Sequence, residues 1–334
     1  MEYTTLKNSR TGKKISVNFR IFEAKDVDAI IFCIRETYGE NYFRPNFYDS
    51  NYLLELNQTG KIKFLIAETD GGEVTGILAL NPKGRMCEIS TGIVQKKYRG
   101  FGIIKKLFEM AVAEIREMKN FYAAYCRTVI YHATTQKLME EINFEPCGFL
   151  MGEFLTDELC NDDFNLKQPH GILIRNISRA KAEKIYIPAE HKKFVQNIYK
   201  ALQVELEIDN QIYSLADDSQ IYCENDDAQK SCSIFVNVAG KDMLDKITAI
   251  EKNFAAPLET FNIFLNLNNK AANLAYEKLK GAGYFFSGIR PICAENEFMI
   301  LHNPKGTAIN FDNFAVTDKF SKVRDYVKKF YNEA

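Results

Sequence analysis

The amino-acid sequence predicts a mixed α/β (α+β) protein built from two domains. Its 334 residues exceed one ordinary hydrophobic core and suit two. Strand-like runs alternate with amphipathic helical segments along the chain, and the order of elements in the first half recurs in the second. These three observations predict domains of residues 1–178 and 179–334, with a linker over residues 178–184.

Composition restricts the classes of function. Apolar residues make up 46% and charged residues 26%, as in soluble globular proteins. The 43 Lys and Arg balance 44 Asp and Glu, which argues against a dedicated binder of nucleic acid or anionic membranes. The sequence lacks an apolar run of ~20 residues, a secretory signal at residues 1–14, and clustered Cys or His ligands. We therefore expect a cytoplasmic protein with reduced thiols, no structural metal, and neither nucleic acid nor membrane as a partner.

In the first half, alternating apolar side chains predict strands, and apolar residues three or four apart predict helices. Asp70-Gly71-Gly72 between two strand-like runs is typical of a hairpin turn. The expected elements are, in order, a strand over 15–23, helices over 26–38 and 47–56, strands over 62–67, 74–80 and 87–94, a helix from Gly102 to about Met118, a strand over 121–129, a helix over 132–142, and strands over 144–155 and 171–177. An acidic, turn-rich stretch over 156–169 separates the last two strands.

The second half is expected to repeat the order strand, helix, strand, helix, strand, strand. It begins with an extended segment over 185–188 and a helix over 189–202. The repeated elements are a strand over 231–239, a helix over 242–254, a strand over 261–267, a helix over 270–279, and strands over 284–291 and 297–302. A final helix over 318–331 carries one apolar face and is expected to dock on the body. Because alternating elements are common, a chance match of order is the alternative.

Residues 89–104 carry the strongest functional signal. A predicted strand runs into a turn with Gly100 and Gly102, which opens directly onto a helix. Successive N–H groups in such a turn, together with the partial positive charge of a helix N-terminus, suit a phosphate or pyrophosphate. The turn has neither the Gly-Lys-Ser/Thr ending of a Walker loop nor the third glycine of a dinucleotide fingerprint. A plain strand-to-helix turn is the alternative interpretation.

Tyr98-Arg99-Gly100-Phe101-Gly102-Ile103 resembles the acyl-CoA pyrophosphate loop of the GNAT acetyltransferases, whose pattern is Arg/Gln-x-x-Gly-x-Gly/Ala. Arg99 and Gly102 match it, whereas Ile104 stands where Gly or Ala is usual. Residues 38–42, 47–48 and 132–137 resemble GNAT modules found alone or fused to anti-sigma-factor kinase domains. The resemblance covers about residues 15–178 well and the second half more weakly. It implies tandem GNAT-like domains, each a mixed, mostly antiparallel sheet flanked by helices.

The resemblance implies direct transfer of an acyl group, usually acetyl, from coenzyme A to a primary amine of a small molecule or protein. Acetyl-CoA would be the co-substrate, with no metal. Its pantetheine arm would pair with the backbone at Ile93 and Val94. Its pyrophosphate would lie on the amides of one loop: Arg99, Gly100, Phe101, Gly102, Ile103 and Ile104. The acceptor would approach past aromatic and basic residues near the loop between the first two helices: Tyr38, Tyr42, Arg44 and Tyr48.

Catalysis would require a base and an acid. A lysine-like amine is protonated at neutral pH and must lose a proton before it attacks. Glu88 stands where many members of the family keep that base; a surface glutamate at a strand end is the alternative. The tyrosine that often returns a proton to the thiolate is replaced by Met139. Tyr131 and His132 are substitutes by proximity, although His132 could equally cap a helix or satisfy a buried carbonyl.

The corresponding turn of the second half, residues 238–242, has one glycine and lacks the Arg-x-x-Gly pattern. A second coenzyme A site is therefore not expected, and Tyr276 is interpreted as a packing residue. The second domain is predicted to be a degenerate copy that shapes the acceptor pocket or mediates association, with a homodimer as one outcome. Two other functions stay open: a non-catalytic acyl-CoA-binding regulatory module, and transfer from aminoacyl-tRNA, which the balanced charge disfavours.

Overall fold

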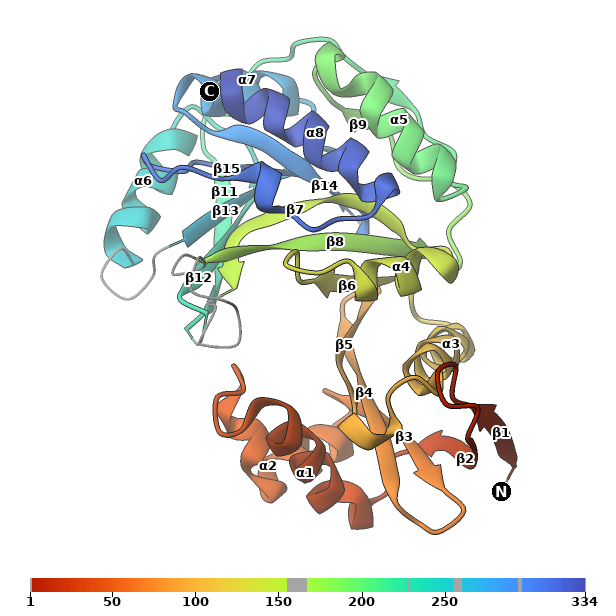
Figure 1. The fold of residues 1–334 in the computed structure, drawn as a ribbon. Helices are drawn as coiled ribbons and strands as arrows, with labels where there is room; N and C mark the ends of the chain where they lie inside the picture. The colour runs from red at the N-terminus through yellow and green to blue at the C-terminus, as the bar shows by residue number, and fades with distance from the viewer. Residues whose placement is uncertain (1, 155–166, 228, 255–259, 294–295, 334) are drawn as a thin grey trace. The chain divides into compact units, whose positions relative to one another are not determined.

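A computed structural model describes residues 2–154, 167–227, 229–254, 260–293 and 296–333 (Figure 1). Most of the predicted acidic stretch over 156–169 lies outside these residues. The chain forms two compact units, residues 1–126 and 127–334. Both contain mostly antiparallel sheet flanked by helices, which confirms the predicted fold class. None of the helices within the described residues is both long and apolar enough to span a membrane.

The first unit orders its strands β1-β2-β3-β4-β5-β6, and all neighbours are antiparallel except the parallel pair β5–β6. Its elements are β1 (Tyr3–Lys7), β2 (Lys14–Ile21), α1 (Val27–Tyr38), α2 (Ser50–Gln58), β3 (Lys63–Thr69), β4 (Val74–Lys83), β5 (Met86–Val94), α3 (Ile103–Glu117) and β6 (Ala123–Thr128), whose end belongs to the second unit. The strand β1 was not expected, because its polar residues are mostly exposed.

Alternation of side chains along β4 defines the two faces of this sheet. Ile77 and Ala79 belong to the buried cluster formed with α1 and α2. Leu78, between them, points to the opposite face, where it lies with Ile104 of α3 close to Gly92. The helices α1 and α2 therefore cover one face and α3 covers the other (Figure 1). Residues 95–102 connect the end of β5 to the start of α3.

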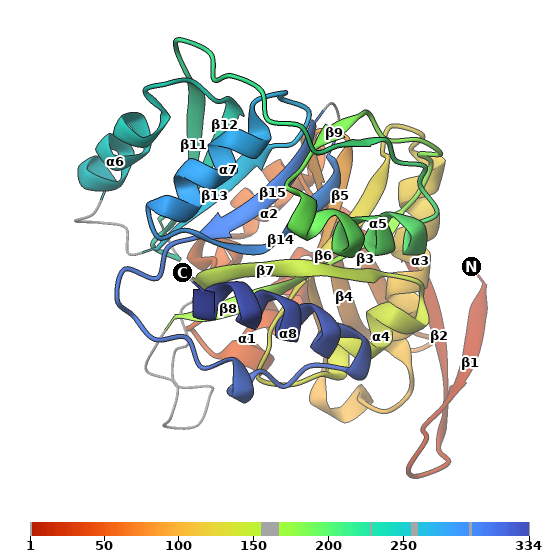
Figure 2. The same ribbon diagram turned by 90° about the horizontal axis from the view of Figure 1, so that it is seen from above.

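The second unit orders its strands β8-β7-β14-β15-β13-β12-β11. Its elements are α4 (Thr134–Glu141), β7 (Glu145–Phe154), β8 (Gln168–Asn176), β9 (Ile185–Tyr186), α5 (Lys192–Ala201), β10 (Ile208–Asp209), β11 (Gln220–Asp226), β12 (Ser231–Val238), α6 (Met243–Phe254), β13 (Thr260–Asn266), α7 (Ala272–Gly281), β14 (Phe285–Cys293), β15 (Asn296–His302) and α8 (Asp318–Glu333). The final helix α8 lies against β7 and β14 (Figure 2), as its apolar face predicted. The ring of Phe320 in α8 stacks on that of Phe149.

Strand pairing in the second half follows the order seen earlier in the chain. The strands β11 and β12 are antiparallel, β12 and β13 are parallel across α6, and β15 is antiparallel to both β13 and β14. Earlier, β4 and β5 are antiparallel, β5 and β6 are parallel across α3, and β7 and β8 are antiparallel after α4. The predicted repeat of element order is therefore present. The strand β11 was not expected, because its sequence is largely polar and exposed.

Two glycines make the junction between β7 and β14, and we expect Gly148→Ala to destabilise the second unit. Gly148 pairs with Gly288, and a Cβ on Gly148 would lie 2.5 Å from the Gly288 Cα. Because backbone on both sides must move, the free energy of unfolding should fall by about 3 kcal/mol. Urea denaturation measures this loss. Gly281→Ala is the control, since a Cβ at Gly281 meets nothing within 4 Å; equal stability of the two variants would contradict the account.

Candidate active site

The glycine turn exposes its backbone and buries its apolar side chains. Gly100 and Gly102 have φ values of +86° and +78°, in the left-handed region that glycine adopts most readily. Phe101 and Ile103, which alternate with them, are buried, whereas both glycines are exposed. Gly102 is the N-cap residue of α3, and a Cβ there would meet nothing within 4 Å. The turn is therefore anchored by its buried side chains and leaves open space beside its main chain at Gly102.

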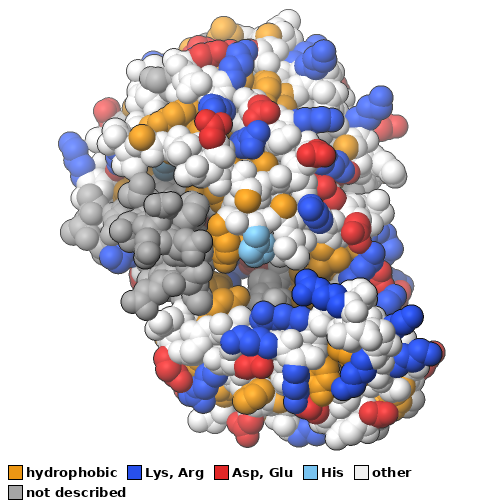
Figure 3. Space-filling model, in the orientation of Figure 1, with side chains coloured by type: hydrophobic (Ala, Val, Ile, Leu, Met, Phe, Trp, Pro, Cys, Tyr) orange, Lys and Arg blue, Asp and Glu red, His pale blue; other side chains and the backbone are white. Residues whose placement is uncertain are grey.

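This open backbone presents hydrogen-bond donors. Among the described residues, the N–H groups of Gly100, Phe101 and Gly102 have no backbone or side-chain acceptor. They precede the first turn of α3, whose N-terminus adds partial positive charge. The side chains of Lys96, Lys97 and Arg99 are exposed before the turn, and Figure 3 shows Lys and Arg among acidic side chains over this unit. The donors, the charge and the space fit a pyrophosphate group.

The turn is fixed to the neighbouring strand β4. Gln95 donates its backbone N–H to the Thr75 carbonyl at 3.0 Å and its side-chain amide to the Val74 carbonyl. Tyr98 donates its hydroxyl to the Glu73 carboxylate at 2.7 Å. These contacts fix the path of the main chain between the end of β5 and the start of α3.

One edge of β5 becomes available beyond Glu88. The ladder between β5 and β6 joins Met86–Glu88 to 123–125, and in the described chain it extends no further. On the other edge, Ile93 and Val94 pair with Ile77 and Gly76 of β4. Within the described residues, β5 therefore has no partner strand on the β6 side beyond Glu88, and the Val94 carbonyl accepts from Arg99 Nε at 3.2 Å. This is the stretch in which Ile93 and Val94 are predicted to hold the pantetheine arm.

Glu88 lies where the two strands separate, and it is 3% exposed. It is paired with Asn81 of β4 and with Tyr125 of β6. The alternative interpretation of Glu88 as a surface residue is therefore wrong. Asn81 lies on the same face of the sheet as Glu88 because the two residues are paired across the strands, and Ser90 lies there because it is two residues further along β5.

A line of hydroxyl groups connects this face to the loop after α1. The Tyr42 hydroxyl lies 3.0 Å from the Thr91 hydroxyl, which lies 3.4 Å from that of Ser90, and the Asn81 amide donates to Ser90 at 2.6 Å. Thr91 has φ +50° at a bulge where the β4–β5 register shifts. Burial raises the pKa of the Tyr42 hydroxyl and outweighs the charge of Arg44 and the hydrogen bond with Thr91, which both lower it. Tyr42 therefore stays protonated at the end of this line of hydroxyl groups.

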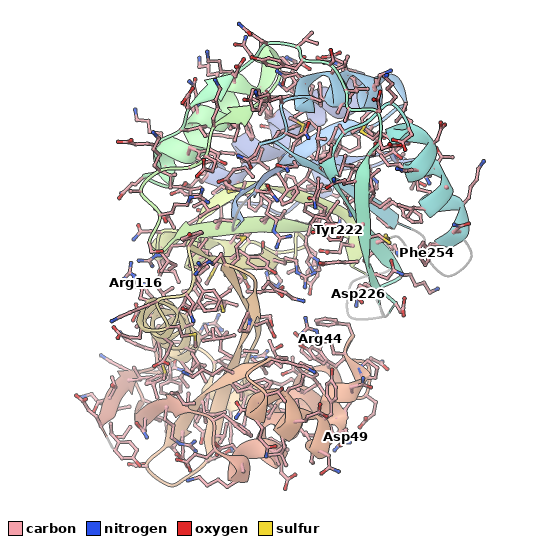
Figure 4. The ribbon with its side chains drawn as sticks, turned by 180° about the vertical axis from the view of Figure 1, so that it is seen from behind. Arg44, Asp49, Arg116, Tyr222, Asp226 and Phe254 are labelled. Atoms are coloured by element: carbon pink, nitrogen blue, oxygen red, sulfur yellow. The ribbon has the colours of Figure 1, made fainter. Side chains whose placement is uncertain are left out.

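The predicted acceptor residues meet in the first unit. The rings of Tyr38 and Tyr42 lie 5.0 Å apart. The Tyr48 hydroxyl accepts from the Tyr42 N–H at 3.0 Å and donates to the Gly39 carbonyl at 2.7 Å, so it stabilises the loop that carries Tyr42. Arg44 lies on the same loop (Figure 4), with its guanidinium group 5.3 Å from the centre of the Phe43 ring.

Tyr131 and His132 belong to the second unit, in the segment before α4. Their rings meet edge to face with centroids 4.9 Å apart. The helix α4 begins at Thr134 and has Ala133 at its N-cap, so His132 is not the capping residue. Met139, at the position usual for the tyrosine, is fully buried in α4. The structure therefore keeps Tyr131 and His132 together but places them in a different unit from Glu88.

Sequence reasoning missed a charged cluster on β6, β7 and β8. The Glu153 carboxylate accepts from Arg127 at 3.0 Å and lies 2.9 Å from Nδ1 of His170. Burial opposes ionisation of Glu153, but Arg127 and His170 outweigh it and lower its pKa to about 2. In the sequence, only the alternation of side chains along three separate strands could have indicated that Arg127, Glu153 and His170 lie together. Across the described residues, groups of three or more His, Cys, Asp or Glu suited to a metal ion are absent.

We expect Glu153→Gln to remove a stabilising charge and a pH dependence. The folded-state pKa is depressed, so the stabilisation is complete above the ordinary pKa of 4.5 and is lost as pH falls towards about 2. The variant should lose about 3 kcal/mol of unfolding free energy at pH 7, because it removes the buried charge that Arg127 and His170 stabilise. Urea denaturation between pH 7 and pH 3 measures the difference from wild type. A difference that does not shrink below pH 4.5 would contradict the assignment.

The turn over 238–242 in the second half is filled by protein. The Gly240 N–H donates to the Ser219 hydroxyl at 2.8 Å, and the Asp218–Ser219 backbone occupies the place of a Cβ on Gly240. The Asp242 carboxylate accepts from the Ser219 N–H at 2.8 Å. Tyr276 is buried and donates its hydroxyl to Glu190 at 2.9 Å, consistent with its predicted packing role. Gly240 therefore lacks both the free N–H and the open space found at Gly102.

Parts of the chain are similar to known proteins in sequence and in structure. Residues 28–144 match the model of the acetyltransferase (GNAT) family. No curated protein sequence matches the chain. Similar solved structures include the spermidine/spermine N-acetyltransferase SpeG of Vibrio cholerae, at 18% identity and TM-score 0.39, covering 48% of this chain and 94% of that one. An N-acetyltransferase of Staphylococcus aureus has 16% identity and TM-score 0.41, covering 48% and 99%. Vibrio cholerae spermidine N-acetyltransferase in complex with CoA and spermine has 17% identity and TM-score 0.41, covering 48% and 95%.

Proposed function

We propose that this chain, whose residues 28–144 form a GNAT acetyltransferase domain, is an acyl-CoA-dependent N-acyltransferase that transfers its acyl group directly to a primary amine. The observation that carries the proposal is the set of open N–H groups at Gly100–Gly102, which lies inside the segment matched by the family. Acetyl-CoA is the proposed donor. The amide groups from Arg99 to Ile104 would hold its pyrophosphate, and the edge of β5 at Ile93 and Val94 would pair with its pantetheine arm.

Coenzyme A supplies the activated acyl thioester when bound, and the chain supplies the proton transfers. Freeing the lone pair of an amine with a pKa near 10.4 costs about 4–5 kcal/mol at pH 7. Glu88 is the proposed base, acting directly or through water, because it is a buried carboxyl group at the point where β5 and β6 separate. Tyr42 and Tyr38 are proposed to line the approach of the acceptor. Tyr131 and His132 stay the candidates for the acid.

The second half is proposed to be a degenerate GNAT-like domain, residues 179–334, without a pyrophosphate loop. The support is the repeated strand pairing from β11 to β15 and the filled turn at Gly240. A domain of this kind would shape the acceptor pocket or mediate association. One coenzyme A molecule per chain is then expected.

The experiment that tests the proposed function measures free thiol after mixing acetyl-CoA with a panel of amines. The panel contains spermidine and spermine, which are named for the compared enzymes, together with lysine-containing peptides and amino sugars. Thiol release that depends on one amine, with its acetylated product identified by mass, is the expected result. The replacement of the usual tyrosine by Met139 favours a second function, a regulatory module that binds acyl-CoA; binding without turnover across the panel would support that function instead.

A further inference from the structure

The turn that joins β1 to β2 contacts the glycine turn of the first unit. Asn8 is 8% exposed and donates its side-chain amide to the Arg99 carbonyl at 3.1 Å. Ser9, next to it, donates its backbone N–H to the Gly100 carbonyl at 3.0 Å. Two successive carbonyl groups of the glycine turn are therefore held by residues about ninety positions earlier in the chain.

The direction of these two carbonyls determines the direction of the next two N–H groups. In a planar trans peptide the C=O and the following N–H point to opposite sides, and none of the described peptide bonds is cis. Because the Arg99 carbonyl points to Asn8, the Gly100 N–H points away from the hairpin. Because the Gly100 carbonyl points to Ser9, the Phe101 N–H does the same. The contact therefore aligns two of the donors that lack a protein acceptor.

Asn8 is itself held in one orientation. Its side-chain oxygen accepts from the N–H groups of Arg10 and Thr11, both at 3.0 Å. Its backbone carbonyl accepts from Gly12 at 3.0 Å, and its N–H donates to the Lys13 carbonyl at 2.8 Å. A side chain with every polar group engaged loses little further entropy on positioning its neighbour. Gly100 allows Asn8 to approach the main chain closely, since a Cβ on Gly100 would lie 3.1 Å from the Asn8 amide nitrogen.

We propose that Asn8 is a positioning residue of the coenzyme A site, which aligns the Gly100 and Phe101 N–H groups for the pyrophosphate before the ligand binds. The proposal rests on the proposed function for the identity of the ligand. The glycine turn is held at two separate points, by the buried side chains of Phe101 and Ile103 and by the turn that contains Asn8. Its N–H donors therefore need little rearrangement when the ligand binds. The hairpin acts through hydrogen bonds to the main chain rather than through the exposed Arg10 side chain.

The experiment titrates the full chain and its Asn8→Ala variant with two probes, coenzyme A and pantetheine, by calorimetry. Asn8→Ala should weaken coenzyme A binding about 10-fold and leave pantetheine binding unchanged, because pantetheine has no pyrophosphate. Arg10→Ala, the control, should bind coenzyme A like wild type. Thermal unfolding establishes that each variant is folded, and in turnover assays Asn8→Ala should raise the KM for acetyl-CoA with little change in kcat.

Three results with the variants would overturn the proposal. These are unchanged coenzyme A affinity in Asn8→Ala, an equal loss for both probes, and an equal loss of coenzyme A affinity in Arg10→Ala. A wild-type chain that binds no coenzyme A would overturn the proposed function and the role of Asn8 together. A wild-type chain that binds coenzyme A without turning it over would overturn only the acyltransferase activity, and the binding arms would still decide the role of Asn8.

Discussion

Replacing Gly102 by glutamate is expected to weaken coenzyme A binding by more than 100-fold. A residue other than glycine is strained at φ +78°, at a cost of about 1–2 kcal/mol. The open space beside Gly102 gives the new carboxylate access to the donors of the turn, where it would compete with the pyrophosphate and repel it. Calorimetric titration with coenzyme A measures the effect.

Gly102→Gln is the matched control, because it has the same backbone strain and nearly the same size without the charge. It should bind coenzyme A at least 10-fold more tightly than Gly102→Glu and less tightly than wild type. If the glutamate and glutamine variants bind equally, the loss comes from the backbone alone, and the pyrophosphate does not lie at this turn. Unchanged coenzyme A affinity in both variants would show that the glycine turn does not bind coenzyme A.

The second large effect is expected for Glu88→Gln, which should lower kcat about 10²–10³-fold with little change in coenzyme A affinity. The amide keeps the size of the buried side chain but cannot accept the proton of the ammonium group. Activity of the variant should then rise about tenfold per pH unit towards the pKa of the amine, because only the neutral amine reacts. Steady-state kinetics between pH 7 and pH 10 measure both features.

Glu114→Gln is the control for this substitution. Glu114 lies on α3, where its carboxylate is 2.7 Å from the Lys63 ammonium group and half-buried, and its variant should keep the wild-type kcat and pH profile. Full turnover by Glu88→Gln, with an unchanged profile, would show that Glu88 is not the base. The proton would then leave through another group.

The sequence predicted the elements and the glycine turn well, because both depend on local patterns. Gly100 and Gly102 directly precede α3, and the apolar alternation of β3 and β4 needs no knowledge of distant residues. The strands β1 and β11 were missed because their exposed, polar side chains carry no alternation. Each lies at a sheet edge, where pairing with one neighbour stabilises a strand that has little apolar surface to bury.

The parts of the site that could not be predicted depend on contacts between distant segments. In the sequence, Asn8 is one more polar residue before the first predicted strand, over 15–23. Only the pairing of β1 with β2 brings it to Arg99. Glu153 and His170 become partners because β7 and β8 are adjacent. Thr91-Gly92 did offer a local signal, since glycine within a strand often marks a bulge. Burial of Glu88 follows from its place between β4 and β6.

The measurement that tests the central claim most directly is a crystal structure of the full chain with coenzyme A. We expect one molecule per chain, with its pyrophosphate on the N–H groups of Gly100, Phe101 and Gly102. Its pantetheine arm should lie along β5 at Ile93 and Val94, with its thiol end towards Glu88. Coenzyme A bound away from the glycine turn, or bound at Gly240 in the second half, would contradict it.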